Sequence, residues 1–444
     1  MKRIVQFVVG VLIAVAILPV VTVSASQEEV DEIPAEAVYS IDYDTKKVLA
    51  SKNADDSQMG IASLTKLMLM YIVMDAVANG EWSLSDEIVV SDYAADISSD
   101  YTLSNVALRA GESYTLEELF ASVAIYSANG SAIAIAEAFA GSEAAFVDQI
   151  HALLESFGIT EYHIVNVTGL NNDYVPEAER YPGSGADDEN TMSAHDMLVV
   201  SDKLVTDYPE VLEYSSVPTA TFREGTIDET HMINFNLMLE GLIYERPGVS
   251  GLKTGTTELS GANLVVTAEE NGRRVVSIVM HAGDGLIDTA TRYEAMNQLL
   301  DYSFDNYENV ELTAENFSSV STQPVSNGQQ DTVALEPAES MVLTLPTTAE
   351  ENAFTVEFAP EEGTTSEEGA LHAPITAGNK VGRFLAQTND KLGYLYEDSG
   401  NHSVDAVAAE TVEELNIFAR AWNGISDFFV NVWNSLFGSI VFAN

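Results

Sequence analysis

The sequence predicts an α+β fold in which helices flank an antiparallel sheet, followed by a small β-rich domain and a C-terminal amphipathic helix. Apolar helical runs occupy 63–79 and 116–140, and two alternating segments around a turn form a hairpin pattern at 262–268 and 275–280. Shorter strands are expected near 37–41 and 48–50. After residue 309, strand-like segments alternate with acidic turns that contain Gly and Pro, at 332–335, 341–345, 354–358 and 381–387.

The N-terminus has the pattern of an export signal. Met1-Lys2-Arg3 is basic, residues 4–23 are apolar, and Val23-Ser24-Ala25 supplies the small residues of a cleavage site. We therefore expect residues 1–25 to be a signal peptide and the mature protein to be exported. A transmembrane anchor is the alternative, but the polar, acidic Gln27-Glu28-Glu29 that follows favours cleavage.

Composition excludes several classes of partner and cofactor. With 69 acidic and 19 basic residues the net charge is −50, which argues against nucleic acid because phosphate binding needs clustered Lys and Arg. The chain has no Cys, so disulfides and thiolate metal sites are excluded. Its seven His residues show no metal-binding spacing, and we expect no metal and no other cofactor.

The first motif that carries chemistry is Ser63-Leu64-Thr65-Lys66, which opens an apolar run typical of a buried helix. Residues three apart share a helix face, so Lys66 can reach the Ser63 hydroxyl. A serine becomes a nucleophile when a base removes its proton, and a lysine is that base when burial or a nearby cation lowers its pKa. The alternative is an ordinary helix start, in which Ser63 caps the helix and Lys66 extends to solvent.

The second motif, Ser127-Ala128-Asn129, lies between two apolar stretches in the small, polar run from Tyr126 to Ala132. That composition predicts a tight loop between two packed helices. Such a loop presents a hydroxyl for proton relay and an amide that holds the substrate and orients Lys66. The alternative is a turn whose Ser and Asn bond only their own backbone.

The third motif, Lys253-Thr254-Gly255, precedes the hairpin. On an edge strand, Lys253 and Thr254 can bind a substrate carboxylate, and Gly255 lets the substrate backbone approach without a Cβ in the way. The backbone N–H groups of Thr256 and Ser63 would then form an oxyanion hole. The alternative is an exposed lysine that protects a sheet edge from aggregation.

The C-terminal residues 411–444 predict an amphipathic helix. One stripe is aromatic and aliphatic, and the opposite face is mostly neutral and polar, as in helices that lie in a membrane interface. The stripe consists of Phe418, Trp422, Ile425, Phe429, Trp433, Leu436 and Ile440. A helix docked on the protein's own core is the alternative.

Together the motifs resemble those of the serine-type D-alanyl-D-alanine carboxypeptidases, which are low-molecular-mass penicillin-binding proteins. The resemblance rests on five segments: 61–68, 127–132, 168–170, 193–197 and 251–257. It implies a catalytic domain of the penicillin-binding-protein and β-lactamase type at 26–309. It further implies a small β domain at 310–408, which holds the catalytic domain away from the membrane, and an anchoring helix at 411–444.

By the same resemblance, Ser63 is the acylated nucleophile, Lys66 the general base and Ser127 the proton relay. The implied substrate-binding residues are Asn129, Lys253, Thr254, Gly255 and Thr256. The implied substrate is a peptidoglycan stem peptide that ends in D-Ala-D-Ala, and β-lactams are the implied covalent inhibitors. The implied location is the extracellular face of the bacterial cytoplasmic membrane, with the protein bound peripherally.

Two other classes of protein share parts of this pattern. A serine β-lactamase has the same fold and motifs but needs a group, often a Glu that holds a water, for fast deacylation. No convincing Glu-x-x-x-Asn element occurs between Ser127 and Lys253. A non-catalytic wall-binding protein is the third class, and the intact set of motif residues argues against it.

Overall fold

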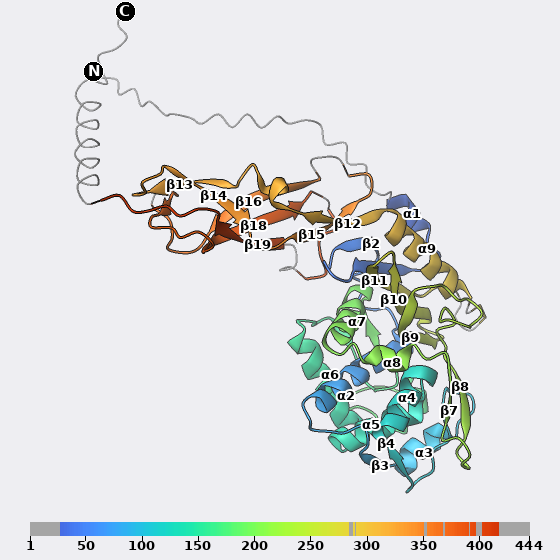
Figure 1. Ribbon diagram of the computed structural model, residues 1–444. Coiled ribbons are helices and arrows are strands. Elements are labelled where there is room, and N and C mark those ends of the chain that lie inside the picture. Colours follow the sequence, from blue (N-terminus) through green and yellow to red (C-terminus); the bar gives the residue numbers. More distant parts are fainter. Residues whose placement is uncertain are drawn as a thin grey trace, which may run out of the picture.

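The computed structural model describes residues 27–416 apart from gaps at 284–286, 289, 350–352, 367–368, 390 and 397–401. The expected signal peptide and residues 417–444 of the expected C-terminal helix lie outside the described residues. The expected start of that helix at 411 is wrong, because residues 411–416 are not helical: Val412 is buried in the β-domain core and exchanges backbone hydrogen bonds with Ile375. Figure 1 shows a first domain, in which helices surround a sheet, and an elongated β domain that extends from one end of it. The first domain carries the three motifs, and we call it the catalytic domain. The predicted α+β fold class is confirmed.

The first domain is built on an antiparallel sheet with strand order β2-β1-β11-β10-β9, so β9 is an edge strand. Its strands are β1 (Ala37–Asp42), β2 (Val48–Lys52), β9 (Val249–Thr257), β10 (Gly261–Glu270) and β11 (Arg273–Met280). Short two-stranded pairs at the periphery are β3 (Glu87–Val89) with β4 (Ser113–Thr115), β5 (Tyr162–His163) with β6 (Thr191–Met192), and β7 (Thr219–Phe222) with β8 (Thr230–Ile233).

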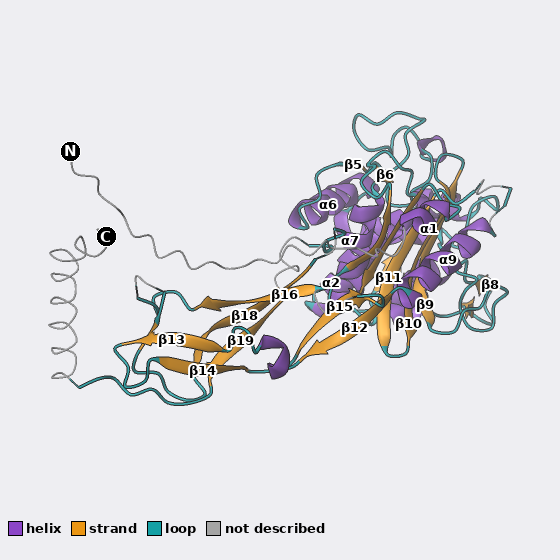
Figure 2. Ribbon diagram, turned by 90° about the horizontal axis from the view of Figure 1, so that it is seen from above, coloured by secondary structure: helices purple, strands orange, loops and turns teal. Residues whose placement is uncertain are grey.

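The helices cover both faces of this sheet (Figure 2). They are α1 (Gln27–Glu32), α2 (Lys66–Ala78), α3 (Asp92–Ser98), α4 (Leu116–Tyr126), α5 (Asn129–Ala140), α6 (Glu143–Ser156), α7 (Ala194–Asp207), α8 (Val211–Ser215) and α9 (Thr291–Asp305). Within the described ranges no single helix is long and apolar enough to cross a membrane; α5 and α6 meet that criterion only as a pair bent by 81°.

Alternation along the strands creates two hydrophobic cores. In β1, Tyr39 and Ile41 join the core that contains α2, α4, α5 and α7, whereas Val38 joins a second core with α1 and α9. Successive side chains of a strand point to opposite faces of the sheet, so a single strand contributes side chains to both cores. The apolar run that predicted a helix from residue 63 is buried in the first core, which places Ser63 and Lys66 at the edge of a rigid layer.

Two local expectations differ from the structure. The loop expected over 126–132 is only two residues long, because α4 ends at Tyr126 and α5 already begins at Asn129; Ser127, which caps α4, has a left-handed φ of 58°. The helix expected from Ser63 starts as the 3-10 turn η1 (Ala62–Thr65), and α2 begins at Lys66. Both changes tighten the turns that carry motif residues.

The β domain follows α9 directly. It has a sheet with strand order β16-β18-β19-β14-β13-β17 and a separate pair, β12 with β15. Its strands are β12 (Tyr307–Leu312), β13 (Thr322–Ser326), β14 (Thr332–Pro337), β15 (Met341–Pro346), β16 (Phe354–Pro360), β17 (Leu371–His372), β18 (Lys380–Thr388) and β19 (His402–Ala408). Phe317 and Phe384 stack at its centre, with ring centroids 4.8 Å apart.

One segment of the β domain, residues 392–396, binds the catalytic domain, and we call it the docking segment. The Leu395 N–H donates to Lys46 O at 2.9 Å, and the Val48 N–H donates to Gly393 O at 3.1 Å. Leu395 is 4% exposed and belongs to the core of the catalytic domain. The Tyr396 hydroxyl donates to the Asp202 carboxylate at 2.8 Å. These contacts fasten the two domains together.

Candidate active site

Ser63 and Lys66 meet where η1 passes into α2. Lys66 is buried, and its Nζ lies 3.0 Å from Ser63 Oγ, 2.8 Å from Asn129 Oδ1 and 2.5 Å from the carbonyl oxygen of Thr168. Asn129 Oδ1 and Thr168 O can only accept hydrogen bonds. A neutral amine donates its two N–H groups to them, which leaves its lone pair for the Ser63 hydroxyl proton.

The electrostatic surroundings of Lys66 favour that neutral form. Burial lowers the pKa of Lys66 well below its ordinary value, and the nearby Lys253 ammonium lowers it further. The Glu143 carboxylate acts in the opposite direction and raises it. The predicted role of Lys66 as a base thus has a physical cause in the structure, whereas a lysine that extends to solvent is excluded by its burial.

Ser127 and Lys253 form the opposite wall of the site. Lys253 Nζ donates to Ser127 Oγ at 2.9 Å and to the Thr254 carbonyl oxygen at 2.9 Å, and both side chains are buried. Burial, followed by the positive charge of Arg292, lowers the pKa of Lys253 to about 7. The left-handed backbone at Ser127 turns this hydroxyl out of α4 toward Lys253. A lysine exposed on a free sheet edge is therefore ruled out.

Asn129 is fixed by the segment that precedes β4. Its backbone N–H and its Nδ2 both donate to the carbonyl oxygen of Ser104, at 2.9 and 3.1 Å. That leaves Oδ1 for Lys66. Asn129 is 2% exposed, so its bonds to Ser104 and Lys66 orient the buried amide in the wall of the site.

Thr168 is held by a compact loop at 166–170. Asn166 Oδ1 accepts hydrogen bonds from the Thr168 N–H, the Thr168 hydroxyl and the Gly169 N–H. Gly169 has φ +72°, and a Cβ there would lie 1.8 Å from Ala62 O. Only glycine lets this loop pack against the turn that carries Ser63.

The third motif lies on the edge strand β9. A Cβ at Gly255 would lie 2.7 Å from Ile61 O and 3.2 Å from Ser63 N. The structure thus gives a reason for glycine that differs from the expected one: β9 must approach the Ser63 turn of the same chain. Behind the strand, Arg292 Nη2 donates to Thr256 Oγ1 at 2.6 Å, and Nη1 donates to the Asn263 carbonyl oxygen at 3.1 Å.

These residues form one site. Lys66 bonds Ser63 and Asn129, while Lys253 bonds Ser127, which lies two positions before Asn129. The Lys253 charge acts on Lys66, and Gly255 packs against the Ser63 turn. The family model described as D-alanyl-D-alanine carboxypeptidase, peptidase S11, matches residues 22–284. The chain belongs to this family. The resemblance inferred from the motifs is confirmed, and the protein is a serine peptidase.

Relatives of this carboxypeptidase family match along most of the chain. D-alanyl-D-alanine carboxypeptidase DacC of Escherichia coli is 29% identical over 419 residues, which cover 93% of this chain and 91% of the relative. DacF of Bacillus subtilis is 26% identical over 358 residues, 81% of this chain and 82% of the relative. Residues 307–414 match the family model of the C-terminal domain of penicillin-binding protein 5.

Solved structures agree with the family assignment. A peptidoglycan synthesis regulatory factor, PBP3 of Streptococcus pneumoniae, has a TM-score of 0.71 and 33% identity, and the match covers 85% of this chain and 99% of that one. Penicillin-binding protein 5 of Haemophilus influenzae shares the fold, with a TM-score of 0.63, 23% identity and coverage of 86% and 98%.

Sequence reasoning missed two charged residues of the carboxypeptidase site. Arg292 is 3% exposed and lies on α9, 36 positions from Thr256 in sequence, yet it contacts the back of β9. Glu143 is also 3% exposed and lies at the start of α6. Neither residue belongs to a local motif, so no pattern in the sequence marked them; their burial in the folded chain does.

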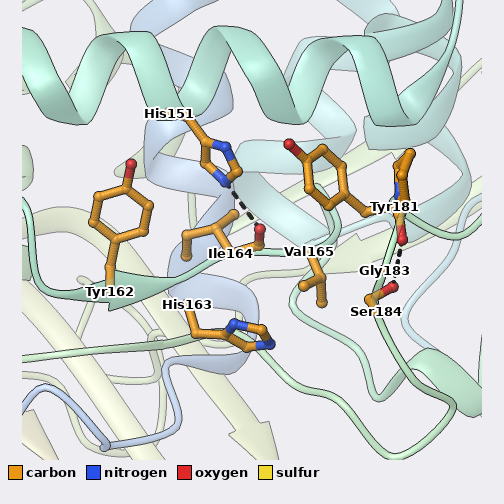
Figure 3. A pocket seen from close by; sticks show the side chains of 9 residues that line it. His151, Tyr162, His163, Ile164, Val165, Tyr181, Gly183 and Ser184 are labelled. Carbon is orange, nitrogen blue, oxygen red and sulfur yellow. Dashed lines mark hydrogen bonds between the residues drawn. The ribbon is translucent and has the colours of Figure 1, made fainter.

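A separate pocket of about 230 Å³ lies outside the site. His151, Tyr162 and Tyr181 line it, and His151 Nε2 is 3.0 Å from the Ile164 carbonyl oxygen (Figure 3). None of the motif residues lines it. In the part of the chain that the structure describes, no three His, Asp or Glu side chains are arranged to hold a metal ion.

Proposed function

We propose that this protein removes the terminal D-Ala from peptidoglycan stem peptides that end in D-Ala-D-Ala, through an acyl-enzyme on Ser63. The observation that carries the proposal is the pair of contacts at the two sides of the site. A buried Lys66 amine lies 3.0 Å from the Ser63 hydroxyl, and a Lys253 amine reaches Ser127. Names of the relatives support the same activity.

The proposed reaction begins when Ser63 Oγ attacks the carbonyl carbon of the penultimate D-Ala and Lys66 Nζ takes the hydroxyl proton. Ser127 relays that proton from Lys66 to the leaving D-Ala nitrogen, which leaves Lys66 neutral again. The free carboxylate of the substrate binds Lys253 and Thr254, with the Arg292 guanidinium behind the strand. The N–H groups of Ser63 and Thr256 stabilise the oxyanion. Water, activated by Lys66, then hydrolyses the ester.

A direct test compares the mature protein with Ser63→Ala on a diacyl-Lys-D-Ala-D-Ala peptide. We expect D-Ala release from the wild type alone. Fluorescent benzylpenicillin should label the wild type covalently and leave Ser63→Ala unlabelled, because the strained β-lactam amide mimics the D-Ala-D-Ala bond. Rapid penicillin turnover without D-Ala release would instead assign the protein as a β-lactamase, and inertness toward both would favour a binding protein.

We also propose that the protein is exported and is bound peripherally to the outer face of the cytoplasmic membrane by an amphipathic helix within 417–444. The basic, apolar and small residues of 1–25 support export. The aromatic stripe that includes Trp422 and Trp433 supports interfacial binding.

Deletion of 417–444 tests the anchor and leaves the buried Val412 and its hydrogen bonds to Ile375 in the β domain intact. The truncated protein should appear in the soluble fraction and keep its D-Ala release, since the site lies within the first domain. A truncated protein that still sediments with membranes would overturn the anchor. A variant with Trp422 and Trp433 both replaced by Ser serves as a full-length comparison, and it should also leave the membrane.

A further inference from the structure

Glu143 is a buried acid beside the catalytic lysine. Its carboxylate accepts a hydrogen bond from the Val167 N–H at 2.9 Å and another from the Tyr93 hydroxyl at 2.7 Å. A buried carboxylate is costly unless it is fully hydrogen-bonded, and a residue of similar size without charge would avoid the cost. The proposed reaction assigns this charge no step.

The contacts of Glu143 connect it to Lys66 through one residue of backbone. Val167 immediately precedes Thr168, whose carbonyl oxygen accepts from Lys66 Nζ at 2.5 Å. Holding the Val167 N–H therefore holds the Thr168 carbonyl against the amine. Since that carbonyl and Asn129 Oδ1 occupy the two N–H groups of neutral Lys66, they determine that the lone pair is directed at Ser63.

We propose that Glu143 is a positioning residue for Lys66, which aligns the amine through the 166–168 loop and, by its negative charge, sets the pH above which Ser63 is acylated. This rests on the proposed acyl-enzyme mechanism. Lys253 and burial lower the pKa of Lys66, and Glu143 opposes them. The negative charge of Glu143 thus limits how far the pKa of Lys66 falls.

Other titratable groups face this pair from each neighbouring element. The pKa of Glu143 is raised to about 6, mainly by burial and to a smaller extent by Glu137 of α5 and Glu179 of the loop before β6. The bonds from Val167 and Tyr93 lower it. Arg292 acts on Lys253 rather than on Lys66. Near neutral pH, Glu143 is therefore mostly ionised, and its negative charge acts on Lys66.

The test measures the rate of Ser63 acylation by fluorescent benzylpenicillin against pH. Glu143→Gln keeps an acceptor for Val167 but removes the charge, so the pKa of Lys66 falls and the acid limb moves to lower pH, by at least about 0.5 unit, with a near-normal plateau. Glu143→Ala also removes the loop contact, and its plateau should fall about tenfold or more. Glu155→Gln, at an exposed position on the same helix, should match the wild type.

Tyr93→Phe provides a second variant that keeps the carboxyl group. Loss of the hydroxyl bond raises the pKa of Glu143, so the acid limb should move in the same direction as in Glu143→Gln, by a smaller amount. An acid limb that stays in place in both variants would overturn the proposal, even if melting temperatures fall, because that pattern indicates a purely structural role. Loss of labelling from Ser63→Ala separately checks the underlying acyl-enzyme.

Discussion

Lys66 and Lys253 are both buried, and the pKa of each is lowered mainly by desolvation. Their tasks require opposite charge states. Lys66 has to be neutral to take the Ser63 proton, whereas Lys253 binds a carboxylate best as a cation. Lys253 is the cation that lowers the pKa of Lys66 further, and Arg292 is the cation that lowers the pKa of Lys253 further, to about 7. We therefore expect activity to depend on pH through these two lysines.

This arrangement predicts a bell-shaped dependence of kcat/KM on pH. The rate should rise as Lys66 loses its proton and fall as pH passes about 7, where Lys253 loses its charge. In Lys253→Arg the charge persists, so the alkaline limb should move to higher pH while the acid limb stays in place. D-Ala release at low substrate concentration measures both limbs. An alkaline limb that does not move would contradict the assignment to Lys253.

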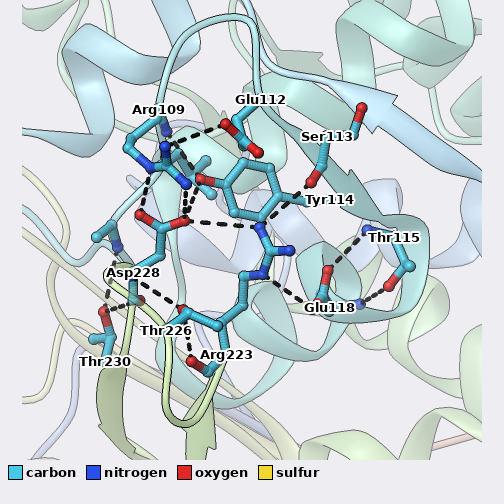
Figure 4. A network of polar contacts seen from close by, with 12 residues as sticks. Arg109, Glu112, Ser113, Tyr114, Thr115, Glu118, Arg223, Thr226, Asp228 and Thr230 are labelled. Atoms are coloured by element: carbon cyan, nitrogen blue, oxygen red, sulfur yellow. Dashed lines mark hydrogen bonds and ion pairs between the residues drawn. The ribbon is translucent and has the colours of Figure 1, made fainter.

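At the scale of elements, a polar network ties the β7–β8 hairpin to the segment before β4 (Figure 4). Asp228 is 2% exposed and accepts from Arg109 Nε at 2.7 Å, Arg109 Nη2 at 3.0 Å and the Tyr114 hydroxyl at 3.0 Å. Arg223 stacks on Tyr114, with 4.5 Å from the guanidinium carbon to the ring centroid. The segment held in this way includes Ser104, which fixes Asn129.

We therefore expect Asp228→Ala to destabilise the first domain and to weaken the site indirectly. The Tm should fall by roughly 3 °C or more, because Arg109 and Tyr114 lose a charged partner. The Arg109 bonds lower the pKa of Asp228 below its ordinary value, so the stabilisation is present above the unfolded pKa and is lost as pH falls through the lower folded value. Calorimetry should show the difference between wild type and Asp228→Ala vanishing in acid.

At the scale of the whole molecule, the docking segment determines how the β domain is attached. The Lys47 ammonium and the Val48 N–H both donate to Gly393 O, and Lys46 bonds Asp202 of α7 at 2.6 Å, the same carboxylate that accepts from Tyr396. Leu395 is buried in the core of the other domain. A linker alone would leave the domains free to reorient, whereas these contacts give the catalytic domain a defined orientation relative to the β domain.

Leu395→Ala should loosen this attachment, since truncation of a buried leucine costs about 2–5 kcal/mol. We expect faster proteolysis within 391–396 and a larger radius of gyration in X-ray scattering, with D-Ala release largely retained because the motif residues are untouched. Val342→Ala, at a residue that is 40% exposed on β15, is the matched control. Scattering curves that superimpose would show that Leu395 is not needed for docking.

The sequence by itself determined the fold class, the family and the motif residues. Each motif is a short local pattern. The segment after Ser63 is an apolar run typical of a buried helix, and the segments after Lys253 alternate as strands of a hairpin do. The hairpin strands were expected within a few residues of β10 and β11. The β domain was expected from strand-like segments that correspond to β14, β15, β16 and β18, while β12, β13, β17 and β19 were missed. The strands β13 and β17 are short, but β19 buries Val404, Ala406 and Ala408 in alternation, a period-two pattern that was there to be found.

Only the tertiary structure decided how these parts act together. Lys253 bonds Ser127 across 126 positions, Arg292 reaches Thr256 from another layer, and Glu143 reaches the loop that holds Thr168. The physical reason is that local patterns encode the periodicity of a helix or strand, whereas the pKa of a lysine depends on burial and on charges that long-range packing brings near. The sequence predicts Lys66 as the base, and the fold supplies the burial and the neighbouring charge that favour its neutral form.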